Sequence, residues 1–141
     1  LDIYFERYTG VKDYMENIKI KAKEDQFVET IMGRRLYLNE INAANGLRRR
    51  AAERAAINAP LQGSAADIIK KAMIDIDKII ANEMPQVKMI MQVHDELVFE
   101  APADSIEFVK TKITNAMQTT VKLSIPLLVD IGTGKNWNES H

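Results

Sequence analysis

Three consecutive polar residues, His94, Asp95 and Glu96, interrupt an otherwise apolar stretch of the chain. Apolar residues alternate before and after them, and this period-two pattern predicts a β-hairpin over residues 87–100 with the triplet at its tip. Two adjacent carboxylates beside a buried sheet cost free energy unless a cation or strong hydrogen-bond donors compensate them. The triplet therefore indicates either a cation-binding tip or a solvated turn, although it lacks the Gly or Asn that tight turns favour.

His94 by itself would also suit a general base or a zinc ligand. The only other histidine is His141, and the chain has no cysteine, so a multi-histidine or thiolate zinc site is not available within it. The chain contains no Gly-x-Ser-x-Gly motif, which argues against a serine hydrolase. The candidate metal ligands are Asp95 and Glu96, whose hard oxygens suit Mg²⁺.

A second set of polar residues is spaced by four: Arg54, Asn58 and Gln62. On a helix this spacing places them along one face, although Pro60 would kink or divide that helix. Amide and guanidinium donors can bond the minor-groove acceptors that every base pair presents, whatever its sequence. The row therefore fits either a contact that checks base-pair geometry or an ordinary hydrated helix face.

Charge is unevenly distributed along a chain whose net charge is only −1. Residues 33–71 carry eight basic and three acidic side chains, a balance of +5, and Arg48 and Arg49 belong to this stretch. Residues 72–103 carry two basic and six acidic side chains, a balance of −4. A phosphate-holding surface beside a cation-holding site would have this distribution, and so would two oppositely charged solvated faces.

The elements around these residues follow from apolar spacing. We expect a helix over 10–25 with Thr9 as its N-cap, a hairpin over 27–38 turning at Gly33, and an Asn-rich loop over 39–46. An Ala-rich helix over 47–59 and a separate helix over 64–83 should follow, with Asp67, Asp75 and Asp77 solvated or capping. A helix over 105–120 and a buried strand over 126–131 complete an α+β chain with an antiparallel sheet and packed helices.

The composition sets limits on the class of protein. The 141 residues suffice for one domain with a core, and 46% hydrophobic and 28% charged residues are ordinary for a globular chain. No apolar run of about 18 residues is present, which argues against a membrane span. The first residues lack an initiator Met and a signal-peptide pattern, so we expect a piece of a longer chain.

Two stretches resemble motifs of one family. Residues 92–98 read Gln-Val-His-Asp-Glu-Leu-Val, and residues 54–63 read Arg-Ala-Ala-Ile-Asn-Ala-Pro-Leu-Gln-Gly. Both resemble family A DNA polymerases of the bacterial DNA polymerase I type, the first their C-terminal catalytic motif and the second the helix before it. The resemblance extends in order from Tyr4 to Trp137.

This resemblance implies a fold and a division of the chain. Residues 1–26 would be the C-terminal part of the fingers subdomain, and residues 27–141 a palm portion that holds the catalytic hairpin. The implied partners are primer-template DNA, deoxynucleoside triphosphates and the remainder of the polymerase chain, with no membrane. The implied location is the bacterial cytoplasm, in association with the nucleoid.

The resemblance also implies roles for individual residues. Asp95 corresponds to the metal-binding aspartate and Glu96 to its less critical neighbour, in a reaction that uses two Mg²⁺ ions about 3.5–4 Å apart. His94 corresponds to the histidine at the primer end. The implied DNA-binding residues are Arg54, Asn58, Gln62, His94, Arg48 and Arg49.

Other parts of the polymerase active site have no match in these 141 residues. The family's first metal aspartate and its nucleotide-binding fingers helix are both missing, so the second ligand set would lie outside this chain. We therefore expect template-directed DNA synthesis from the intact enzyme and none from this piece alone. The alternative is a non-catalytic nucleic-acid-binding module that uses the basic stretch, with the acidic tip serving only structure.

Overall fold

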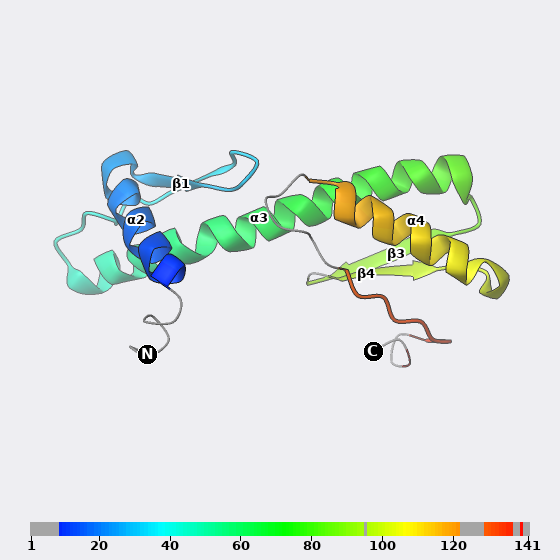
Figure 1. Ribbon diagram of the computed structural model, residues 1–141. Helices are drawn as coiled ribbons and strands as arrows, with labels where there is room; N and C mark the ends of the chain where they lie inside the picture. The colour runs from blue at the N-terminus through cyan, green and yellow to red at the C-terminus, as the bar shows by residue number, and fades with distance from the viewer. Residues whose placement is uncertain (1–8, 95, 122–128, 137–138, 140–141) are drawn as a thin grey trace. The chain divides into compact units, whose positions relative to one another are not determined.

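The computed structural model describes residues 9–94, 96–121, 129–136 and 139 (Figure 1). The chain forms two compact units, Leu1–Asp67 and Ile68–His141. Both contain helices and a two-stranded antiparallel sheet, which confirms the predicted α+β class. The predicted division at residue 26 rests on the family resemblance and stays a prediction.

The first unit opens with helix α2, Thr9–Asp25, within one residue of the predicted span. Its inner face contributes Ile18 and Ala22 to the core of the unit. The helix ends where Gln26 takes a left-handed backbone conformation, with φ of 61°, and its N–H donates to the carbonyl of Ala22 at 2.8 Å. A left-handed residue commonly ends a helix in this way, but the usual residue is Gly, so this conformation of Gln26 was not predictable from its residue type.

Strands β1, Phe27–Glu29, and β2, Arg35–Tyr37, form the predicted antiparallel hairpin, with Val28 opposite Leu36. The turn between them includes Gly33, whose φ of 82° is accessible to Gly at little cost. This hairpin and α2 pack on the first half of the next helix. The shared core consists of Ala22, Val28, Leu38, Ile41, Ala52 and Ala56.

Helix α3 runs without interruption from Gly46 to Glu83 (Figure 1). Its N-terminus is capped by Asn45, whose side-chain oxygen accepts hydrogen bonds from the N–H groups of Leu47 and Arg48 at 2.9 and 3.2 Å. Asn is among the preferred N-cap residues because its side chain replaces the missing helical acceptors. The helix therefore begins at the end of the Asn-rich loop, one residue before the predicted start.

The predicted break between two helices near Pro60 is wrong, because Pro60 lies inside α3. A proline removes one backbone donor, here the partner of the Ala56 carbonyl, and its ring crowds that turn. The next carbonyl along, that of Ile57, accepts a hydrogen bond from the Tyr14 hydroxyl at 3.1 Å. The Tyr14 hydroxyl and the buried packing of Ala52 and Ala56 stabilise the helix at the turn that contains Pro60.

The second unit contains strands β3, Lys88–Val93, and β4, Glu96–Glu100, as the sequence predicted for 87–100. Met89 lies opposite Phe99, but Met91 lies opposite Val98, so Ile90 is the extra residue of a β-bulge. The bulge shifts the phase of the strand after it. Regular alternation would place Met91 on the same face as Met89, but the bulge puts it out of phase, and Met91 is 40% exposed.

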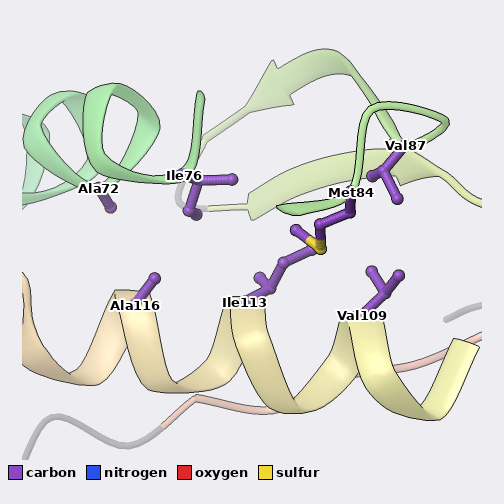
Figure 2. Close-up of a cluster of buried hydrophobic side chains, with 7 residues drawn as sticks. All are labelled: Ala72, Ile76, Met84, Val87, Val109, Ile113 and Ala116. Carbon is purple, nitrogen blue, oxygen red and sulfur yellow. The ribbon is translucent and has the colours of Figure 1, made fainter. Parts of the chain in front are cut away.

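The short 3₁₀ helix η1, Ala103–Ser105, leads into α4, Ile106–Thr119, close to the predicted helix. Figure 2 shows the core of this unit, where residues of α4 face residues of α3 and of the segment leading to β3. The buried side chains are Ala72, Ile76, Met84, Val87, Val109, Ile113 and Ala116.

The predicted C-terminal strand and the predicted solvation of the α3 aspartates have mixed outcomes. The strand predicted over 126–131 falls partly on 122–128, outside the described residues, and residues 129–131 form no strand. Asp77 is exposed as predicted, whereas Asp67 is 8% exposed and hydrogen-bonded, so its predicted solvation is wrong. Within the described ranges, no helix is long and apolar enough to span a membrane.

Candidate functional site

The polar triplet begins directly after β3, which ends at Val93, and its last residue, Glu96, opens β4. Val93 pairs with Glu96, which leaves only residues 94 and 95 to reverse the chain. His94 adopts a left-handed conformation with φ of 54°, as two-residue hairpin turns require of their first residue. Asp95 lies outside the described residues, so its predicted metal role stays a prediction. Glu96 is the first residue of β4 rather than part of the turn.

A side chain of β3 supports this turn. The Gln92 side-chain amide donates to the carbonyl oxygen of His94. The left-handed conformation of His94 is strained for a residue other than Gly or Asn. The bond from Gln92 helps to hold the backbone in this conformation. The sequence showed Gln92 only as part of the recognised motif and gave no sign of this role.

The described side chains of the tip are open to solvent. His94 and Glu96 are both exposed, whereas Leu97 and Phe99, further along β4, pack against the core of the unit. The partly buried strand β4 thus begins with an exposed acidic residue, Glu96. This geometry leaves Glu96 accessible to a ligand without a large desolvation cost.

A complete metal site is not present among the residues that the structure describes, since no group of three or more His, Asp or Glu side chains converges there. Mg²⁺ usually retains several waters and takes one or two protein carboxylates together with substrate phosphates. Glu96 and its neighbour at position 95 suit such an incomplete set. A structural zinc site, which needs four protein ligands, does not fit this tip.

The polar row predicted on the helix is preserved because α3 continues past Pro60. Arg54, Asn58 and Gln62 are all exposed, and each step along the row advances about 6 Å along the helix axis. The row lies away from the buried Ala52 and Ala56, which face the core. Three donors therefore follow one exposed helix face at regular intervals.

The two arginines near the start of α3 have different surroundings. Arg48 is largely exposed, and its Nη1 lies 4.0 Å from Glu40 Oε1, a distance at which an exposed ion pair contributes little. Arg49 donates from Nη1 to the Ala43 carbonyl at 3.1 Å, and its Nε lies 4.0 Å from Glu53 Oε1. Arg49 is thus partly engaged with the loop before the helix, and Arg48 is the more accessible cation.

The candidate residues belong to separate units. Arg48, Arg49, Arg54, Asn58 and Gln62 lie in the first unit, and His94 and Glu96 lie in the second. The residues of each group thus lie together in one unit.

Sequence reasoning also missed Asp67, one turn beyond Gln62, which is buried and bonded to the β1–β2 turn. No pattern signal could reveal a partner 33 residues away.

Comparison with known proteins identifies the family to which this chain is similar. A family model described as DNA polymerase family A matches residues 1–139. A protein of Pseudomonas aeruginosa named DNA polymerase I is 50% identical over 141 residues, which are 100% of this chain and 15% of that protein. A DNA polymerase I of Lactococcus lactis is 46% identical over 140 residues, which are 99% of this chain and 16% of that protein.

A solved structure matches as well. It is described as the POL domain of Pol1 from M. smegmatis in complex with DNA primer-template and dNTP. The TM-score is 0.94 at 42% identity, and the match covers 97% of this chain and 24% of that one. The chain thus spans 15% to 16% of the length of the two relatives named above.

Proposed function

The chain belongs to DNA polymerase family A, and from this membership we propose that it is the C-terminal palm portion of a bacterial DNA-directed DNA polymerase. In this proposal residues 1–26 end the fingers subdomain and residues 27–141 form the palm portion. The observation that carries the proposal is 50% identity to a DNA polymerase I across all 141 residues. The intact protein would extend a primer on a DNA template with deoxynucleoside triphosphates, in the bacterial cytoplasm at the nucleoid.

The hairpin tip would hold divalent cations through Asp95 and Glu96. The exposure of Glu96, the hard oxygens of both carboxylates and their adjacency in the sequence support this assignment. When bound, two Mg²⁺ ions would supply neutralisation of charge on the reacting phosphate and activation of the primer hydroxyl. His94, exposed at the same tip, would contact the primer end.

Helix α3 would contact the DNA. Arg54, Asn58 and Gln62 would donate to minor-groove acceptors, which purine N3 and pyrimidine O2 place similarly in every correct pair. Their exposure on one continuous helix face supports this role. Arg48 and Arg49 would contact phosphates, where a cation adds affinity without reading sequence.

This chain would not act alone. Its relatives are more than six times as long, and a two-ion site needs a second set of ligands, which we place elsewhere in the intact polymerase. The remainder of the polymerase chain is therefore a necessary partner. Primer extension by the isolated 141 residues should not exceed the blank, and clear incorporation would contradict this part of the proposal.

The direct test uses the intact polymerase that contains this sequence. Asp95→Ala should abolish nucleotide incorporation and leave primer-template binding largely in place. Asp104→Asn is a matched control, because Asp104 is an exposed acid of the same unit outside the hairpin. Wild-type incorporation by Asp95→Ala would refute the metal role. DNA binding that is equal in Mg²⁺ and in chelator, without any incorporation, would favour a binding module.

A further inference from the structure

The turn of the β1–β2 hairpin lies unusually close to α3, immediately after Gln62. A Cβ placed on Gly63 would lie only 2.6 Å from the Thr30 side-chain methyl, closer than real Cβ atoms approach other atoms. Gly63 costs the helix some stability, and the close approach explains why it is there. The hairpin therefore packs directly against the helix backbone at this point.

Asp67 is the centre of the contact. It is 8% exposed, and its Oδ2 accepts a hydrogen bond from Thr30 Oγ1 at 2.5 Å. Its Oδ1 accepts from Arg34 Nε at 3.0 Å and lies 2.9 Å from Arg34 Nη2. The paired guanidinium nitrogens and the hydroxyl compensate a buried carboxylate and hold it in one orientation.

Two further bonds join the same turn of helix to the hairpin. Arg34 Nη2 donates to the carbonyl of Gly63 at 3.3 Å, and the N–H of Ile31 donates to Ser64 Oγ at 2.8 Å. Gln62 lines a pocket of about 230 Å³ beside these contacts, together with Arg34 and Pro60. The residues that follow Gln62 are thus fixed to a second element of the structure.

The helix needs this support near Gln62. Pro60 lies two residues earlier and removes a backbone hydrogen bond from the same segment. The Tyr14 hydroxyl supports the helix before Pro60, at Ile57, and the hairpin contacts restrain it after Pro60, where a bend would change the direction of the Gln62 side chain. The contacts from Thr30 and Arg34 begin at Gly63, the residue immediately after it.

We propose that Thr30, Arg34 and Asp67 form a positioning lock, which sets the direction of Gln62 and so determines how strongly the polymerase rejects a mispaired primer end. The inference rests on the proposed function, since it takes Gln62 as a minor-groove contact. Asp67 is 8% exposed and its carboxylate is paired with Arg34, so we expect no direct contact of Asp67 with DNA. An effect of Asp67 on extension must therefore act through its neighbours.

The test uses the intact polymerase with four variants: Asp67→Asn, Thr30→Val, Gln62→Ala and the double variant Gln62→Ala/Asp67→Asn. Thr30→Val is the milder change, because it replaces the hydroxyl by a methyl and keeps the methyl that contacts Gly63. Arg35→Ala is the matched control, since Arg35 is the next arginine of the hairpin and pairs with Glu29 on that hairpin. Measurements are kcat and KM for extension of matched and mismatched primer ends, and the melting temperature.

Asp67→Asn and Thr30→Val should lower the ratio of matched to mismatched extension, by up to about a hundredfold for Asp67→Asn if the Gln62 side chain is displaced by near 1 Å. Arg35→Ala should leave this ratio unchanged. In the Gln62→Ala background, Asp67→Asn should have no further effect on the ratio, because the lock has nothing left to position. A merely structural role would lower the melting temperature and leave the ratio unchanged, which would overturn the inference.

Two other results separate the inference from the function on which it rests. If Gln62→Ala lowers the ratio and Asp67→Asn lowers it again by its full factor, the lock does not act through Gln62 and the inference is wrong, while the proposed function stands. If Gln62→Ala leaves the ratio unchanged, the minor-groove role itself fails, and the inference fails with it.

Discussion

Replacement of Gly63 by Ala tests the packing of the hairpin on α3 in terms of stability. Two effects of opposite sign compete. Ala is favoured over Gly inside a helix by about 1 kcal/mol. The new methyl, however, would lie 2.6 Å from Thr30 Cγ2, and overpacking of this kind typically costs about 1–3 kcal/mol.

The Thr30 methyl cannot turn away at low cost. Thr30 Oγ1 donates to Asp67 and accepts from the N–H groups of Met32 and Arg34 at 3.3 and 3.2 Å, so rotation of the side chain would break these bonds. The steric effect should therefore exceed the helix effect. We expect Gly63→Ala to lower the free energy of unfolding by about 1 kcal/mol.

A second background changes the sign. Thr30→Ser keeps the hydroxyl bonded to Asp67 and removes the methyl, so Gly63→Ala in this background should raise the free energy of unfolding by up to about 1 kcal/mol. The assay is urea unfolding of the 141-residue chain, followed by far-ultraviolet circular dichroism. Equal stabilisation by Gly63→Ala in both backgrounds would refute the close approach of the hairpin to the helix.

Two further predictions concern the second unit. Ile76 is fully buried, so Ile76→Ala should lower the free energy of unfolding by about 2–5 kcal/mol, whereas Ile74→Ala, at an exposed position of the same helix, should cost far less. The hydrogen bond from Thr120 and, second, the one from Lys71 lower the pKa of Asp75 below its usual 3.8. The stabilisation that comes from this lowered pKa is present above pH 3.8 and is lost as the pH falls through the folded-state pKa. Thr120→Val should therefore lower the free energy of unfolding at neutral pH and lower it less in strong acid. Urea unfolding at the two pH values measures this difference.

The sequence predicted elements whose signal is local. Helical spacing located α2 and α4, and apolar alternation around a polar triplet located the β3–β4 hairpin. It could not predict the continuity of α3, because the proline penalty is local while the contacts that offset it come from α2. The sequence also could not show the bulge at Ile90. Met89, Ile90 and Met91 are all apolar, so the apolar alternation is satisfied with or without an extra residue.

The same limit applies to the candidate site. The order of residue types located the exposed tip and the polar row on α3, and both lie within the residues that the family model matches. The burial of Asp67 was not predictable, because a charged residue on a helix is usually solvated and its partners lie on a distant hairpin. The roles of Asp95, Glu96 and His94 depend on ligands outside this chain and stay predictions.

Anomalous diffraction can show whether the hairpin tip binds a divalent cation. Crystals of the intact polymerase with primer-template and a non-reactive deoxynucleoside triphosphate would be soaked in Mn²⁺. If Asp95 binds the cation, an anomalous peak should lie within bonding distance of an Asp95 carboxylate oxygen and should be lost in Asp95→Asn. Density for DNA and nucleotide without any anomalous peak beside Asp95 would contradict this cation-binding role.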